Sequence, residues 1–218
     1  MIDGVSGGAL VIRNPKFVIK DIKLEEVGTK QQQKDRKYPL FTFVIRKTYN
    51  LSLGKILHLF LKSTDLLSSP VDDIDKEALH KLPFWNSQLI YKEFINLESN
   101  LLHRQKISRI YAESLNKDVL LANLANQINT SSNLRFPIFV KNREKLILYL
   151  KQDNVFVSDI WYDAPIAPKK YLHMTNYRKG TCINSERVTD EILNLPTHKS
   201  VSEMDARKIV NRINIWLK

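Results

Sequence analysis

Apolar positions in the carboxy-terminal part of the chain first alternate and then recur with helical spacing. Residues 134–140 alternate, which predicts a strand, and Pro137 favours an edge position or a bulge in it. Asn142 fits the cap of a helix with Leu146, Ile147 and Leu150 inward, and Asn154 suits its left-handed stop. Val155 then begins a second strand that leads into the loop Trp161–Pro168. The pattern predicts a strand, helix, strand unit.

Helical spacing dominates the middle of the chain. It predicts one or two helices over 40–67, interrupted at Gly54, and a long helix from a cap at Asn86 to about Leu115. A shorter helical stretch, 119–128, precedes the polar joint 129–133, a plausible domain boundary. The polar run 28–37 is predicted to be a mobile surface loop.

Shorter segments near the two ends of the chain also predict secondary structure. Residues 9–12 form an apolar run suited to a buried strand, and 72–75 resemble the acidic start of a short helix. Near the other end, 185–193 predicts a helix stopped by Pro196, and 194–198 predicts a loop. Ser202 to Asp205 resembles a capping box that opens the last helix. The inward positions of that helix are Ala206, Ile209, Val210, Ile213, Trp216 and Leu217.

The composition of the chain excludes several classes of protein. The 218 residues are 43% hydrophobic and 26% charged, which favours a folded chain. A single cysteine, Cys182, excludes an internal disulfide framework, and five histidines without ligand spacing predict no structural metal. The amino terminus has no secretory signal, and no apolar stretch approaches the ~20 residues of a membrane span. We therefore expect a cytoplasmic protein.

The net charge of +11 favours anionic partners. The basic clusters are short, however, and no nucleic-acid-binding motif accompanies them, so nucleic acid is not expected as the main partner. The basic, amphipathic stretch 40–67 permits two interpretations. It either contacts a membrane surface or packs on the protein's own core, and packing is the commoner use of such a stripe.

Two loops contain the residues best suited to a binding cleft. Trp161 and Tyr162 offer rings that can stack on a sugar or nucleotide, His198 can donate to a hydroxyl or phosphate, and Lys169 with Lys170 can pair with phosphate. Packing at a strand end or a turn is the competing interpretation for the aromatic pair and for the histidine. Cys182 fits a small buried residue better than a nucleophile.

Several of these segments together resemble one enzyme family. The matching pieces are Arg135-Phe136-Pro137-Ile138, Asn142-Arg143-Glu144, Val157-Ser158-Asp159-Ile160-Trp161-Tyr162, Cys182 ahead of a helix, and Leu195-Pro196-Thr197-His198 followed by Val201-Ser202-Glu203. In order and spacing they resemble the carboxy-terminal domain of the DegT/DnrJ/StrS-type sugar aminotransferases. The resemblance is good from 134 to the end and poor over about 16–80.

The resemblance implies an α/β (α+β) fold in which helices pack on a small sheet, as in the small domain of aspartate-aminotransferase-like (fold type I) enzymes. It implies pyridoxal 5'-phosphate as cofactor, a nucleotide-linked keto sugar and an amino donor such as glutamate as substrates, a role in lipopolysaccharide biosynthesis, and a homodimer. By the same resemblance, 1–83 is a remnant of the coenzyme-binding large domain with a helical connector, 84–133 an inter-domain helix and joint, and 134–218 the small domain.

The resemblance also bears on catalysis. Ser6-Gly7-Gly8-Ala9 resembles the strand start that follows the family's Schiff-base lysine, so Gly7 and Gly8 are candidate cofactor-binding residues and the lysine itself is expected to precede Met1. Transamination needs that lysine as Schiff-base partner and proton carrier. We therefore expect this chain to be a fragment without catalytic residues or bound coenzyme. The alternative is a non-catalytic basic module that binds nucleic acid or a membrane surface.

Overall fold

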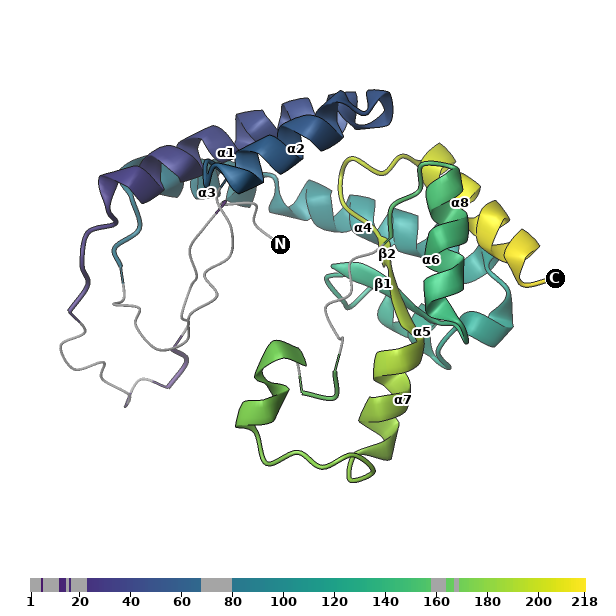
Figure 1. The fold of residues 1–218 in the computed structure, drawn as a ribbon. Helices are drawn as coiled ribbons and strands as arrows, with labels where there is room; N and C mark the ends of the chain where they lie inside the picture. The colour runs from purple at the N-terminus through teal and green to yellow at the C-terminus, as the bar shows by residue number, and fades with distance from the viewer. Residues whose placement is uncertain are drawn as a thin grey trace. The chain divides into compact units, whose positions relative to one another are not determined.

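The computed structural model describes residues 5, 12–14, 16, 23–67, 80–157, 164–166 and 169–218 (Figure 1). The chain divides into two compact units, Ile2–Asn96 and Leu97–Lys218, and each is described by itself. The predicted strand 9–12 and the predicted acidic helix start 72–75 lie wholly or mostly outside the described residues.

The amino-terminal unit contains three helices, α1 (Thr29–Thr48), α2 (Leu53–Ser63) and α3 (Phe84–Ile95), among its described residues. Helix α1 begins at Thr29, so the prediction of a loop over 28–37 was wrong. The lysines, glutamines and arginine of this run are good helix formers, which explains why a strongly polar segment is helical.

Helices α1 and α2 pack against each other across a short 3-10 turn, Tyr49–Leu51. The break between them falls at Ser52, whose φ of 65° lies in the left-handed region, and not at Gly54 as predicted. Gly54 is instead buried inside α2. A Cβ added there would lie 2.2 Å from the carbonyl oxygen of Ile45, so glycine is what allows α2 to approach α1.

The predicted long helix is two helices in the structure. Asn96 separates α3 from α4 (Leu97–Ser114) with φ −90° and ψ 6°, and its side-chain amide donates to the carbonyl of Lys92 at 2.9 Å. Asn86, predicted as the cap, is buried within the first turn of α3, and Pro83 precedes the helix. Proline suits that position because it needs no amide partner.

The carboxy-terminal unit has a two-stranded antiparallel sheet surrounded by helices in its described part (Figure 1). Strand β1 (Arg135–Phe139) pairs with β2 (Ile192–Pro196), and Phe136 lies opposite Leu195. The helices besides α4 are α5 (Leu124–Gln127), α6 (Arg143–Gln152), α7 (Ile183–Glu191) and α8 (Glu203–Trp216), with 3-10 helices at Lys117–Val119 and Lys169–Met174. A mixed α/β fold with helices on a small sheet is therefore confirmed.

Three local predictions differ from the structure. The partner of β1 is β2, which covers most of the segment predicted to be a loop, because Leu193 and Leu195 enter the core. Val155–Val157 is not a strand, and the rest of that predicted strand, 158–162, lies outside the described residues. Cys182, predicted to be buried, is exposed.

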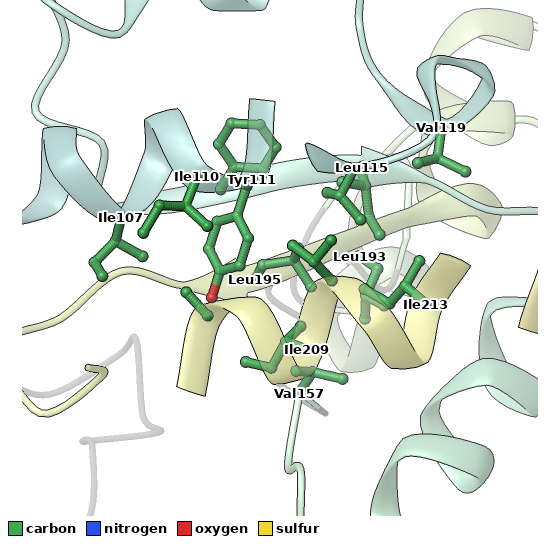
Figure 2. Packing of buried hydrophobic residues seen from close by; sticks show 14 of the residues in the cluster. Ile107, Ile110, Tyr111, Leu115, Val119, Val157, Leu193, Leu195, Ile209 and Ile213 are labelled. Atoms are coloured by element: carbon green, nitrogen blue, oxygen red, sulfur yellow. The ribbon is translucent and has the colours of Figure 1, made fainter. Parts of the chain in front are cut away.

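The core of this unit lies between α4, the sheet and α8. Figure 2 shows Tyr111 of α4 and Leu115, the residue after this helix, facing Ile209 and Ile213 of α8, with side chains of β2 between them. Each such large apolar side chain contributes roughly 1.5–3 kcal/mol when fully buried. The predicted inward positions of β1, α6 and α8 are confirmed, and Asn154 adopts the left-handed conformation at φ 57°. The same core fixes the loops at both ends of β2.

Candidate functional site

A buried polar junction lies at the carboxyl end of β2. Thr197, the residue after the strand, has a fully buried side chain, and its hydroxyl lies 2.6 Å from the carbonyl oxygen of Asn133 and 3.0 Å from that of Leu134. Arg104 of α4 donates from Nη1 to the Thr197 Oγ1 at 3.0 Å and to the Leu134 oxygen at 3.1 Å. This junction connects α4, the start of β1 and the end of β2.

The junction carries positive charge. Arg104 is only 7% exposed, and both of its hydrogen bonds go to neutral oxygens. Burial lowers the pKa of its guanidinium, and the charge of Arg135 lowers it further. An arginine keeps its proton in spite of such a shift. The end of the sheet therefore presents a fixed cation beneath the turn that contains His198.

Near the junction, an exposed ion pair joins α4 to the start of α8, and the turn with His198 follows β2. Lys106 of α4 pairs with Glu203 of α8 at 2.5 Å, and this pairing lowers the pKa of Glu203, with smaller contributions from Arg207 and His103. His198 is half-buried in the turn after β2, and its carbonyl accepts a hydrogen bond from the amide of Val201 at 2.9 Å. The turn is thus braced by its own backbone hydrogen bond.

A second polar cluster precedes and opens α7. The Glu186 Oε1 accepts hydrogen bonds from the Tyr177 hydroxyl at 2.6 Å and from the amides of Gly180 at 2.7 Å and Cys182 at 3.4 Å. The bond with Tyr177 lowers the pKa of Glu186 and raises the pKa of Tyr177 to about 12. These contacts hold the loop 177–182 against the helix.

A second buried arginine supports the opposite end of β2. Arg143, at the start of α6, donates from Nη1 to the carbonyl of Thr189 at 2.6 Å and to that of Ile192 at 3.0 Å. It thereby satisfies carbonyls at the transition from α7 to β2, which a helix end otherwise leaves without partners. Its role is to position the strand.

The structure describes two of the six candidate site residues. Lys169 is exposed at the start of the 3-10 helix Lys169–Met174, which lies towards the α7 end of β2, whereas His198 follows the other end of that strand (Figure 1). Their elements are therefore not neighbours. Gly7, Gly8, Trp161 and Tyr162 lie outside the described residues, so their roles stay predictions.

Sequence reasoning missed the residues that organise both ends of β2. Arg104 stands on the mostly apolar face of α4, one turn before Ile107, and a charged residue in such a place indicates a buried polar contact. Thr197 lies in the predicted loop 194–198, and nothing in the local sequence pattern indicates that its side chain is buried. Glu186 stands in the first turn of a helix, where a carboxylate near free backbone amides is common.

The lysine–carboxylate ion pairs Lys34–Asp65, Lys81–Glu26 and Lys106–Glu203 do not form a site for the coenzyme implied by the resemblance. Pyridoxal phosphate needs a lysine amine and a carboxylate on opposite sides of its ring. Lys34 and Asp65 are 2.5 Å apart, Lys81 and Glu26 3.0 Å, and Lys106 and Glu203 2.5 Å. No ring can lie between atoms in direct contact, so these pairs do not form a coenzyme site.

No helix in the described ranges has the length and apolar character to cross a membrane. Over the same part of the chain, no group of three or more His, Cys, Asp or Glu side chains could hold a metal ion.

Comparison with solved structures shows which fold the chain has. One similar solved structure is a DegT DnrJ EryC1 StrS aminotransferase from Brucella abortus, with 24% identity over 76% of this chain and a TM-score of 0.52. Another is S. venezuelae DesV in complex with a ketimine intermediate, with 13% identity over 69% of this chain and a TM-score of 0.54. These likenesses show an aminotransferase fold. The chain spans only 43% and 41% of the two structures.

The family follows from the sequence match. The model of the DegT/DnrJ/EryC1/StrS aminotransferase family matches residues 81–214, more than half of the chain. The chain belongs to this family, as the resemblance predicted. A search of the curated proteins finds no significant match.

Proposed function

We propose that this chain forms the carboxy-terminal part of a pyridoxal-phosphate-dependent sugar aminotransferase. The observation that carries the proposal is the family match over 81–214, which includes all of the sheet and most of its helices. In the proposed reaction of the whole protein, an amino donor such as glutamate supplies nitrogen to a nucleotide-linked keto sugar for lipopolysaccharide. We further propose a cytoplasmic homodimer, as in the expectation from the resemblance.

Within that protein, the proposed role of this chain is to bind the nucleotide-sugar. His198 would donate to a hydroxyl or phosphate of the substrate above the fixed charge of Arg104. Trp161, Tyr162 and Lys169 stay candidate substrate contacts, although the 3-10 helix of Lys169 does not neighbour the turn of His198. When bound, pyridoxal phosphate supplies the electron sink of transamination. The chain itself carries no Schiff-base lysine in this proposal and does not transaminate alone.

Ligand binding tests the substrate role. We expect a nucleoside diphosphate sugar to shift the amide NMR signals of 197–201 in the 218-residue chain. We expect His198→Ala to reduce these shifts and weaken binding. His173→Ala is the matched control, because His173 is exposed in the 3-10 helix Lys169–Met174. Binding that His198→Ala leaves unchanged would contradict the assignment of this residue.

Borohydride trapping tests the catalytic part of the proposal. The 218-residue chain is incubated with pyridoxal phosphate and reduced, and the modified lysines are located by mass spectrometry. We expect low, scattered modification of surface lysines. Stoichiometric modification of a single lysine, with a visible absorption band that a Lys→Ala change at that position removes, would show that the chain holds its own coenzyme.

A further inference from the structure

Helix α1 has an outer face that combines apolar and basic side chains. Leu40, Phe43 and Val44 are exposed on it, and Phe43 is 59% exposed. Lys37 and Lys47 lie on the same face one turn to either side, as the 3.6-residue period requires. The amine of Lys47 lies 6.0 Å from the ring centroid of Phe43. Cations therefore border an exposed apolar patch.

Helix α2 repeats this arrangement over eleven residues. Its exposed apolar side chains are Leu53, Ile56, Leu59 and Phe60, which are between 57% and 66% exposed. They recur at spacings of three and four and so share one face of the helix. Lys55 and Lys62 lie at the edge of this stripe and are also exposed.

Helices α1 and α2 pack on each other through faces other than their exposed apolar ones. Ile45, Gly54 and Leu61 are buried, and the backbone of α2 approaches α1 at Gly54. The exposed stripe of α2 is consequently not the surface that packs on α1. It has no partner within the described part of this unit that removes it from water.

Helices α1 and α2 carry a strong excess of positive over negative side chains. From Thr29 to Ser63 the sequence has eight lysines and arginines and a single acid, Asp35, which is buried. Two of these cations, Lys30 and Lys34, pair with Asp65 just beyond α2, and the other six include those that border the apolar stripes. Two copies of this surface would bring like charges together, which disfavours self-association. A nucleic acid would satisfy the cations but leave the leucine and phenylalanine side chains in water.

From this arrangement we infer that α1 and α2 form a docking surface for an anionic lipid membrane. Such a surface offers both required partners, because acidic head groups attract lysine and arginine and the acyl boundary accepts apolar side chains. The helices would lie in the plane of the membrane, in keeping with the finding that none of the described helices can span it. This inference does not depend on the proposed aminotransferase activity.

Vesicle co-sedimentation tests the inference. The 218-residue chain is mixed with vesicles of equal amounts of phosphatidylcholine and phosphatidylserine, or of phosphatidylcholine alone. We expect binding to the mixed vesicles that falls with added salt, and at least tenfold weaker binding to neutral ones. We expect the double variant Ile56→Ser, Phe60→Ser to weaken binding at least tenfold.

Two further variants separate the contributions. Lys37→Gln with Lys62→Gln leaves the apolar stripe intact and should weaken binding while reducing its salt dependence. Leu148→Ser with Met204→Ser removes side chains of comparable exposure in the other unit and should bind like the parent chain. Circular dichroism of each variant confirms its helix content.

Three results would overturn the inference. The first is no binding to the acidic vesicles. The second is binding that both surface variants leave unchanged. The third is a dimer, seen by light scattering, that the Ile56→Ser, Phe60→Ser variant dissociates, because the surface would then be an interface between copies of this chain.

Discussion

The Nη1 of Arg104 donates a hydrogen bond to the Oγ1 of Thr197 over 3.0 Å, although 93 residues separate them along the chain. The same guanidinium donates to the carbonyl oxygen of Leu134. The Thr197 hydroxyl lies within hydrogen-bond distance of the carbonyl oxygens of Asn133 and Leu134. One side-chain pair therefore joins the middle of α4 to both strands. The turn that contains His198 begins at this pair.

A double-mutant cycle should show that Arg104 and Thr197 act together. We expect Arg104→Met and Thr197→Val each to lower the free energy of unfolding by about 2 kcal/mol, because each leaves buried hydrogen-bonding groups without partners. The double variant should lose less than the sum, by about 1 kcal/mol. Native-state hydrogen exchange of the β1 and β2 amides measures these differences.

Thr130→Val is the control for this cycle. Thr130 is exposed, and its hydroxyl contacts a carbonyl within its own turn at 3.3 Å. Its replacement should change the stability by less than about 0.5 kcal/mol. Strict additivity of the two buried substitutions would show that the pair is not coupled.

The ionisation of Tyr177 gives a prediction at alkaline pH. Its hydrogen bond to Glu186 raises its pKa from 10.0 to about 12, so the folded chain holds this proton more tightly than the unfolded chain does. The stabilisation is fully present below pH 10 and is lost as the pH rises through about 12. We expect Glu186→Gln to return the pKa of Tyr177 towards 10 and to remove this loss.

Tyrosinate absorbance measures this titration. The step centred near pH 12 should disappear in Tyr177→Phe and should remain in Tyr91→Phe, a control at a 69% exposed position. If Tyr177→Phe takes away a tyrosine that titrates near pH 10, the hydrogen bond to Glu186 does not persist in solution.

The sequence predicted the parts of the fold that depend on local periodicity. The alternation around Phe136 and the helical stripe ending at Ile213 are burial patterns, and both match the structure. The strand at Leu195 was missed because its pairing with Phe136 is a contact between distant segments, which no local window contains. Helix α1 was missed because a polar helix resembles a polar loop.

The candidate site was less predictable than the fold. His198 could be chosen from its residue type and its place after Leu195-Pro196, but Arg104, which places a cation under that turn, belongs to a helix 93 residues before Thr197. A buried arginine is distinguished from a solvated one only by the elements that cover it. The position of the buried Arg104 charge is therefore known only from the structure.

The capping box of α8 gives a prediction about the turn that contains His198. Ser202 Oγ accepts a hydrogen bond from the amide of Asp205 at 3.1 Å, and the Asp205 carboxylate accepts one from the amide of Ser202 at 3.0 Å. Ser202→Ala should cost about 1 kcal/mol and raise hydrogen exchange in the first turn of α8. Ser200→Ala, two residues earlier in an exposed turn, is the matched control.

Acid titration of the same box tests its carboxylate. Hydrogen bonds from Ser202 lower the pKa of Asp205 below its ordinary 3.8, so its contribution to stability is present above that pH and is lost as the pH falls through the lowered value. In Asp205→Asn, the hydrogen-exchange protection of the α8 amides should depend less on pH in this range. Because α8 follows His198 by only a few residues, the variant should also loosen the 197–201 turn. Unchanged exchange at the amide of Val201 would show that the turn is held by Arg104 and Thr197 alone.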